Sequence, residues 1–277
     1  MVKPTSKKFE QTWENVWRSF KRDQNIEKTI KKHKYERKYL YEILIKYLKK
    51  SPNKLPKFLE VGCGTAIDSY ILANKINSDV YGIDLVQESI DLAHEISKNF
   101  NKKIKLVTCD GKKMPFKSES FDMVFSQGLL EHFKEPSDLI KEQLRILKVN
   151  GYLVISVPQT YNPYTLYKRP RIKMGTWPYG WETSYSLADL KKIEKKYSNL
   201  ELIDRCGYGY DIKHDYGLGL LRYGINRIQG INPIRNFFLF RLIEDLYEGV
   251  WSIPEKSFGH HFMISIVGVY RKKNEKQ

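Results

Sequence analysis

The chain has 277 residues, of which 41% are hydrophobic, and a formal net charge of +16. This length allows one domain with a full-sized core and some additions, and the hydrophobic content excludes an intrinsically disordered chain. No apolar run approaches the roughly 18 to 20 residues of a membrane span, and residues 1–8 do not lead into an apolar signal core. We therefore expect a soluble, cytoplasmic protein without a transmembrane segment.

The basic residues and the cysteines limit the partners that we expect for the chain. Lysine pairs occur along the whole sequence and not in one basic segment, a distribution typical of solvated faces. Binding of RNA and peripheral contact with an acidic membrane surface are the alternatives that the charge leaves open. The three cysteines, Cys63, Cys109 and Cys206, are too few and too scattered for a disulfide framework or a zinc site, so we expect reducing surroundings.

The first 50 residues are predicted to form a helical cap, and residues 51–277 the main domain. In the cap, aromatic and apolar residues recur at the spacing of one helical face. They are Phe9, Trp13, Val16, Trp17 and Phe20. We expect this face to cover a pocket.

A nucleoside-binding turn is predicted where the first strand ends. Residues 58–61 have the pattern of a buried strand, and Glu60 stands where that strand emerges. Gly62 and Gly64 let the backbone turn sharply and approach a ligand closely. Dinucleotide-binding turns have the pattern G-x-G-x-x-G, and here Ile67 replaces the third glycine. The branched side chain argues against a pyrophosphate site.

Strands and helices alternate through the rest of the chain, which is the pattern of a mostly parallel sheet with helices on both faces. The predicted strands lie at residues 58–61, 80–83, 104–108, 121–126, 152–157, 200–205 and 262–270. The predicted helices lie at about 68–75, 88–100, 136–147 and 187–197, and Gly151 is expected in the turn before the fifth strand. The expected fold class is α/β.

Two segments interrupt this alternation. Residues 158–183 leave the carboxyl end of the fifth strand, where open sheets bind ligands, and an ordered loop of this length is usually functional, so we expect a substrate lid. Its candidate aromatic residues, with two from the cap, are Trp13, Trp17, Tyr161, Tyr164, Trp177, Tyr179 and Trp181. Residues 207–259 form a predicted helical insertion. We expect its apolar stripe to pack in the core, with a pocket wall or a membrane-surface contact as alternatives; the stripe consists of Leu239, Leu242, Ile243, Leu246 and Val250.

Three successive strands each present an acid at the same edge of the predicted sheet. Besides Glu60, Asp84 closes the second strand, 22 residues after Gly62, and Asp110 ends the third. At this distance from a glycine turn, an acidic side chain reaches the hydroxyl groups of a nucleoside ribose. The alternative for Asp84 is a helix N-cap, and the alternative for Asp110 is a turn made by the pair Asp110–Gly111.

The segment from Glu60 to Ala66 resembles motif I of the class I S-adenosylmethionine-dependent methyltransferases, E/D-x-G-x-G-x-G, with Ala66 at the last glycine. Residues 126–133 resemble motif IV of the ubiquinone-biosynthesis-like (methyltransferase type 11) group, which commonly has the pair Glu131–His132 at this place. The resemblance covers about residues 55–160. It implies a Rossmann-like seven-stranded sheet with the last strand antiparallel, and S-adenosylmethionine as the cofactor.

The resemblance also implies roles for single residues. Asp110 would hold the adenine amino group beside an apolar wall from Met114 and Pro115, and Gln127 would face the methionine end. His132 is the candidate general base, because an imidazole with a pKa of about 6.5 suits proton removal near neutrality; the alternative is that it positions the loop or bonds to the cofactor. The full set of implied cofactor contacts is Glu60, Gly62, Cys63, Gly64, Asp84, Leu85, Asp110, Gly111 and Gln127.

The acceptor is expected to be a small molecule or a glycan or lipid-linked precursor, methylated on oxygen. Residues 126–129 lack the Asn/Asp-Pro-Pro-Tyr pattern of amino-group methylation on adenine or glutamine, and the chain has no Pro-Cys pair for cytosine carbon methylation. His260 and His261 are adjacent on a strand and point to opposite faces, so no metal site is expected. The alternatives are methylation of an RNA (tRNA) base and a non-catalytic protein that binds the cofactor or a partner.

Overall fold

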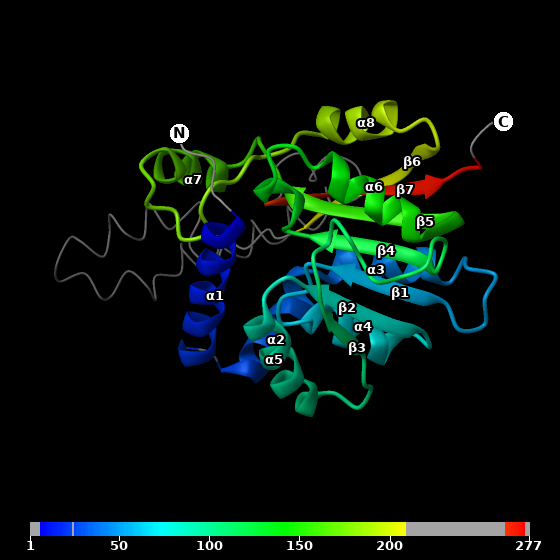
Figure 1. The fold of residues 1–277 in the computed structure, drawn as a ribbon, viewed down its shortest axis with the longest axis horizontal. Helices are drawn as coiled ribbons and strands as arrows, with labels where there is room; N and C mark the ends of the chain where they lie inside the picture. The colour runs from blue at the N-terminus through cyan, green and yellow to red at the C-terminus, as the bar shows by residue number, and fades with distance from the viewer. Residues whose placement is uncertain (1–5, 24, 209–263, 275–277) are drawn as a thin grey trace, which may run out of the picture.

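A computed structural model describes residues 6–23, 25–208 and 264–274. Its centre is a seven-stranded sheet with the strand order β3-β2-β1-β4-β5-β7-β6 (Figure 1). The strands are β1 (Lys57–Val61), β2 (Asp79–Asp84), β3 (Lys105–Thr108), β4 (Phe121–Gln127), β5 (Leu147–Pro158), β6 (Leu200–Tyr208) and β7 (Ser265–Lys272). Neighbouring strands from β3 to β5 pair in parallel, and β7 runs antiparallel to both β5 and β6. The predicted α/β fold with an antiparallel last strand is confirmed.

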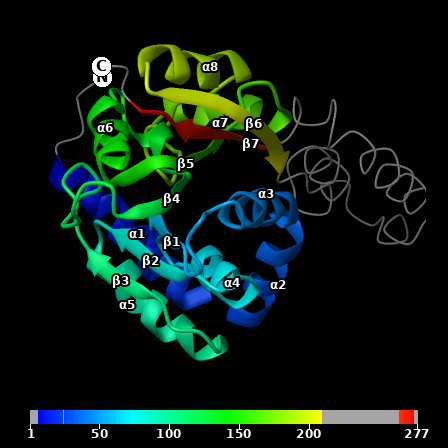
Figure 2. The ribbon, with the colours of Figure 1, turned by 90° about the vertical axis from the view of Figure 1, so that its right-hand side faces the viewer.

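Helices cover both faces of this sheet, as predicted. The helices are α1 (Ser6–Asp23), α2 (Ile26–Glu36), α3 (Lys38–Leu48), α4 (Ile67–Lys75), α5 (Gln87–Ile96), α6 (Ser137–Ile146), α7 (Pro163–Lys173) and α8 (Leu187–Lys196), with short 3-10 helices at Ser97–Asn99 and Leu130–His132. One buried cluster joins α3, α4 and α5 to the sheet, and a second joins α6 and α8 to its other face. Figure 2 shows these two layers along the strands. None of the helices in the described ranges combines the length and apolar character of a membrane span.

The N-terminal 50 residues divide into parts with different surroundings. Helix α3 packs into the core through buried residues that include Leu40 and Leu44. Helix α1 stands at the edge of the sheet where the parallel strands end (Figure 1). It is tied to α5 by two surface ion pairs, Arg18–Glu88 at 2.8 Å and Lys21–Glu95 at 2.5 Å. Exposed pairs of this kind contribute about 0–1 kcal/mol each, so aromatic packing is what chiefly holds α1 in place.

The structure differs from the sequence prediction after β4 and after β5. Strand β5 begins at Leu147, so Gly151 lies inside the strand and not in a turn before it; the preceding Asn150 takes a φ of 63° at this irregular start. Residues 158–183, predicted as a loop, contain α7, whose N-terminus is capped by the Asn162 side chain accepting a hydrogen bond from the Thr165 amide at 2.8 Å. The predicted stripe at residues 239–250 lies outside the described residues.

A buried carboxylate joins the loop before β1 to β4. Asp122, the second residue of β4, accepts hydrogen bonds from Ser51 Oγ at 2.8 Å, the Lys57 amide at 2.9 Å, Lys148 Nζ at 2.9 Å and Asn53 Nδ2. Burial raises the pKa of Asp122, but the hydrogen bonds from Lys57 and Lys148 outweigh it and hold the pKa below its usual value. The ionised carboxylate therefore stabilises the folded state.

We expect Asp122→Asn to lower the free energy of unfolding at pH 7 by about 1.5–3 kcal/mol, the contribution of hydrogen bonds to a charged group. Because the pKa of Asp122 is lower in the folded state, its contribution is full above the unfolded value of about 3.9 and is lost as the pH falls toward the folded value. Urea unfolding at pH 7 and below pH 4 measures both effects. The exposed Glu135→Gln is the control, and an equal loss in both variants would contradict this role.

Candidate functional site

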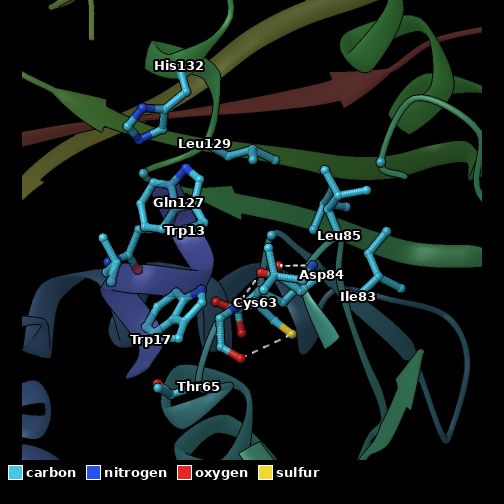
Figure 3. Close-up of a pocket in the computed structure, with 18 of the residues that line it drawn as sticks. Trp13, Trp17, Cys63, Thr65, Ile83, Asp84, Leu85, Gln127, Leu129 and His132 are labelled. Carbon is cyan, nitrogen blue, oxygen red and sulfur yellow. Dashed lines mark hydrogen bonds between the residues drawn. The ribbon is translucent and has the colours of Figure 1, made fainter. Parts of the chain in front are cut away.

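A cavity of about 320 Å³ lies at the carboxyl ends of β1, β2 and β4, under α1. All ten predicted site residues line this cavity. They are Glu60, Gly62, Cys63, Gly64, Asp84, Leu85, Asp110, Gly111, Gln127 and His132. The five apolar residues of α1 that were predicted to cover a pocket also line it. Figure 3 shows Trp13 and Trp17 from this helix facing the cavity.

The glycine turn after β1 brings the backbone very close to its neighbours. Gly62 and Gly64 have φ angles of +71° and +51°, a conformation that favours glycine. A Cβ atom added at Gly62 would lie 2.9 Å from Leu129, and one added at Gly64 would lie 2.6 Å from the Trp17 ring. Strand β2 holds the turn in place, because the amides of Gly62 and Cys63 both donate to the Ile83 carbonyl at 2.8 Å. Side chains at 62 and 64 would fill the cavity edge.

Ala66 takes the same left-handed conformation, with a φ of 54°, directly before α4. An L-residue in this conformation is destabilised by roughly 1–2 kcal/mol. This explains physically why a glycine is usual at the last position of the motif that the chain resembles. The departure at Ala66 therefore affects backbone strain and not access to the cavity.

Asp84, at the end of β2, uses both of its carboxylate oxygens to hold the surrounding backbone. Oδ2 accepts a hydrogen bond from the Gly64 amide at 2.8 Å, and Oδ1 accepts one from the Val86 amide at 3.0 Å. Burial raises the pKa of Asp84, and the two amides oppose this shift. Val86 is the residue that precedes α5 as its N-cap, so Asp84 supports the turn before the helix without being the cap itself. Each oxygen has a further lone pair for a ligand hydroxyl.

The loop after β3 lines the cavity with the turn at Asp110 and Gly111. Asp110 Oδ1 accepts a hydrogen bond from the Lys112 amide at 2.9 Å, which is the turn expected of an Asp-Gly pair. The predicted apolar wall lies elsewhere: Met114 is buried in the core, and its amide donates to Glu142 at 2.7 Å. Leu85 and Leu139 supply apolar surface to the cavity instead.

The floor of the cavity is a buried polar cluster that the sequence did not predict. Arg37, between α2 and α3, donates to Asp68 Oδ2, and Tyr41 donates to Asp68 Oδ1. With its amide oxygen facing Arg37, Gln127 accepts from Nη1 at 2.9 Å and from Nη2 at 3.1 Å, and its amide nitrogen donates to Asp68 Oδ2 at 3.0 Å. Burial raises the pKa of Asp68, but the Arg37 charge, together with His33 and the Tyr41 hydroxyl, outweighs burial and holds the pKa far below its usual value. The cluster is an ion pair at neutral pH.

His33 and Glu60 lie beside this ion pair. His33 Nδ1 is 3.5 Å from Asp68 Oδ1 and makes no hydrogen bond within the described part of the chain, and burial lowers the pKa of this imidazole. Glu60 accepts a hydrogen bond from Ser69 Oγ on α4, and burial, followed by the charge of Asp68, raises the pKa of Glu60 well above its usual value. Glu60 is therefore bonded to the helix after the glycine turn.

Aromatic rings surround His132 at the other end of the cavity. The ring centroid of Trp13 lies 5.0 Å from that of His132, and the Phe9 centroid lies 6.2 Å from it. His132 Nδ1 is 3.4 Å from the Trp181 carbonyl oxygen, and burial lowers the pKa of His132. Figure 3 shows Trp13 between Trp17 and His132. One face of α1 thus spans the cavity from the glycine turn to the histidine.

The predicted lid residues have different surroundings. Tyr179 lines the cavity and stacks on Trp13, with centroids 6.0 Å apart. Trp177 is buried and its Nε1 donates to Glu182 Oε1 at 2.8 Å, whereas Tyr161 is exposed. The Tyr164 side chain and the pair His260–His261 lie outside the described residues. In the described ranges, no three His, Cys, Asp or Glu side chains come together in a way that suits a metal ion.

The middle of the chain matches a known domain family: residues 59–155 match the methyltransferase domain. The ubiquinone biosynthesis O-methyltransferase of Pelagibacter ubique is 27% identical over 168 residues, which are 58% of this chain and 68% of that protein. The demethylmenaquinone methyltransferase of Lactobacillus johnsonii is 30% identical over 133 residues, 47% of this chain and 50% of that protein.

A solved structure shares the fold over almost the whole chain. It is a SAM-dependent methyltransferase of Thermotoga maritima, described as a candidate histamine N-methyltransferase, with a TM-score of 0.59 and 15% identity over 96% of this chain and 100% of that one. The chain contains a class I S-adenosylmethionine-dependent methyltransferase domain. Its cofactor is S-adenosylmethionine, as predicted. The methyltransferase spans 68%, 31% and 50% of the lengths of the first three curated relatives that it matches.

The residues of the methyltransferase that sequence reasoning missed are those with no motif around them. His33 lies on α2 and Arg37 between α2 and α3, both before the glycine turn, and Asp68 was predicted only as the start of a helix. One signal was present: a histidine and an arginine four residues apart share one helical face. Many surface helices of so basic a chain have the same spacing, so the signal could not single out this pair.

We expect Asp84→Asn to weaken binding of S-adenosylmethionine by the methyltransferase about tenfold to hundredfold, because hydrogen bonds to a charged group contribute roughly 1.5–3 kcal/mol each. Titration calorimetry with the cofactor measures this change. Asp79→Asn, at the opposite end of the same strand, is the matched control and should bind normally. Unchanged affinity in Asp84→Asn, with urea stability preserved, would exclude contact between Asp84 and the ribose.

Proposed function

We propose that this methyltransferase transfers a methyl group to an oxygen atom of a small apolar acceptor, free or lipid-linked. One observation carries this proposal: a single cavity has charged and hydroxyl-binding groups at one end and an aromatic chamber with one histidine at the other. The first end suits a charged nucleoside, and the second suits an apolar ring that carries a hydroxyl group.

The charged end has the groups that S-adenosylmethionine requires. Arg37 offers donors to a carboxylate, and His33 Nδ1 is a buried polar atom without a hydrogen bond among the described residues. We assign the amino-acid end of the cofactor to these two residues, with Asp68 facing its ammonium group. Asp84 would accept hydrogen bonds from the ribose hydroxyls, and Leu85 and Asp110 would border the adenine.

The close packing at the glycine turn supports the same assignment. A Cβ atom at Gly62 or Gly64 would lie within 3.0 Å of Leu129 or Trp17, so only a bare backbone leaves room for a ligand there. When bound, the cofactor supplies a methyl group on a sulfonium, which is already activated for transfer. What remains for the chain is to align donor and acceptor and to exclude water.

The chamber around His132 is suited to a flat apolar acceptor. Phe9, Trp13 and Tyr179 present ring faces and edges to it, and such rings contribute large apolar contact areas. Two relatives have names that refer to ubiquinone biosynthesis and to demethylmenaquinone. Those names support an aromatic hydroxyl compound as the class of acceptor.

We assign to His132 the removal of the acceptor proton. A proton on Nδ1 would face the Trp181 carbonyl oxygen at 3.4 Å, which leaves Nε2 as the acceptor atom. The hydroxyl proton would pass to Nε2 as the acceptor oxygen takes the methyl group, whose bond to sulfur breaks so that the sulfonium leaves as a neutral thioether. Since burial lowers the pKa of His132, the imidazole is neutral and able to accept this proton at pH 7.

Methyl transfer from labelled S-adenosylmethionine to four acceptor classes tests the function. We expect label in catechols and prenylated dihydroxybenzenes extracted into organic solvent, and none in bulk tRNA or glycan fractions. Label in tRNA with a rate that falls steeply with salt would establish RNA as the acceptor instead. Cofactor binding without label in any fraction of a cell extract would show a non-catalytic protein. Asp84→Asn serves as the control for cofactor-dependent labelling.

We expect His132→Gln to lower kcat about 10²- to 10⁴-fold, the usual contribution of a positioned base, and to leave the Kd of the cofactor unchanged. Because the neutral imidazole is the active form and its pKa lies below the ordinary 6.5, the wild-type kcat should stay constant above neutrality and fall only in more acidic solution. The variant should lack this acidic limb. Normal turnover in His132→Gln, or the same pH profile in both proteins, would remove His132 as the base.

A further inference from the structure

Helix α7 and the residue that follows it expose large apolar side chains to solvent, whereas the helix buries a charged one. Leu166 and Met174 are 72% and 67% exposed, whereas Lys168 is fully buried. Lys168 Nζ forms an ion pair with Glu182 Oε2 at 2.8 Å. Lysine is among the residues least often buried, and large apolar side chains gathered on a surface commonly mark a binding site. The orientation of α7 is therefore the reverse of an ordinary surface helix.

The exposed side chains of α7 form an ordered face. Leu166, Pro170 and Met174 follow one another at intervals of four residues, so they form one stripe along the helix. Arg169 and Lys173 are exposed one position before Pro170 and Met174, and they therefore border this stripe. Tyr161, which is exposed just before the helix, extends the apolar surface. We call these six residues the α7 face.

Helix α7, which carries most of the α7 face, is connected to the cavity by a chain of aromatic contacts. Tyr167 of α7 meets Trp177 edge-on, with centroids 6.5 Å apart, and Trp177 meets Tyr179 at 5.6 Å. Tyr179 in turn stacks on Trp13 at 6.0 Å. Trp13 belongs to α1, which stands where the parallel strands end (Figure 1) and lines the cavity. Whatever binds the α7 face thus lies beside the aromatic end of the cavity.

We propose that the α7 face docks this protein on an anionic lipid bilayer. The α7 face combines exposed apolar side chains, which can enter the head-group region, with an arginine and a lysine that can pair with acidic head groups, and the 11-residue α7 is too short and too charged to cross a bilayer. The net charge of +16 adds a long-range attraction to an acidic surface. For the lipid-linked acceptor of the proposed function, docking places the aromatic end of the cavity at the bilayer. Only this last step rests on the proposed function.

The charge pattern favours a bilayer over a second copy of the chain or an RNA. Two copies facing each other through the α7 face would bring Arg169 and Lys173 of both copies together, which is unfavourable. An RNA would engage the basic residues but would leave the stripe of Leu166, Pro170 and Met174 without apolar contact. A bilayer with acidic head groups matches both kinds of side chain at once.

Co-sedimentation with vesicles tests the proposal without cofactor or acceptor, so its outcome is independent of methyl transfer. We expect the full chain to sediment with phosphatidylglycerol/phosphatidylcholine vesicles and to bind pure phosphatidylcholine vesicles at least tenfold more weakly. Leu166→Glu with Met174→Glu should reduce binding to the anionic vesicles at least tenfold. Arg169→Ala with Lys173→Ala should reduce binding and its dependence on salt.

Two matched controls lie at the opposite edge of the sheet. Leu55, before β1, is 51% exposed, so Leu55→Glu adds the same charge to another exposed leucine. Lys102→Ala with Lys103→Ala removes two exposed charges before β3. Both controls should bind anionic vesicles like the wild type, and all variants should keep their cofactor affinity and melting temperature.

Three results would overturn the proposal. The first is a wild-type chain that does not sediment with anionic vesicles. The second is a Leu166→Glu, Met174→Glu variant that binds them normally, or a Leu55→Glu control that loses binding equally. The third would come from sedimentation velocity: the wild type is an oligomer, and the Leu166→Glu, Met174→Glu variant is a monomer that still binds vesicles normally. That result would make the α7 face a contact between copies.

Discussion

The buried ion pair between Arg37 and Asp68 is the interaction on which the cavity and much of the fold depend. It joins the junction of α2 and α3 to the start of α4, and Gln127 at the end of β4 bonds to both partners. Removing one member of a buried pair destabilises a protein by about 3–5 kcal/mol, because the other charge is left without compensation. The N-terminal helices are therefore fixed to the sheet at the same atoms that form the cavity floor.

The acidic residues gather at one edge of the sheet because the strands that carry them are parallel. Strands β1, β2 and β3 are parallel neighbours, so the residues after them meet at one edge. Glu60 bonds to α4 and Asp84 bonds to the glycine turn, so each carboxylate holds the backbone as well as lining the cavity. Because each side chain holds the chain and also borders the cavity, the sequence was compatible with both a structural and a ligand-binding interpretation of Asp84 and Asp110.

Much of the fold could be predicted because its signals are local. The apolar runs of the strands and the glycines at 62 and 64 depend only on neighbouring residues, and parallel topology then places Asp84 and Asp110 beside them. The polar floor could not be predicted, since Arg37 and Asp68 are 31 residues apart and meet only through packing of helices. Helix α7 was missed because its prolines and aromatics indicated a loop; the Asn162–Pro163 start signal was present but overlooked.

Helix α1 gives the two ends of the cavity a common wall. Trp17 lies against Gly64 at the glycine turn, and Trp13 and Phe9 lie against His132. A ligand that shifts α1 at one end therefore moves the surface that a second ligand meets at the other. Such coupling is reciprocal by thermodynamic necessity: whatever one occupant does to the affinity for its neighbour, the neighbour does in return. A substitution that moves this helix as a whole would therefore alter both ends of the cavity together.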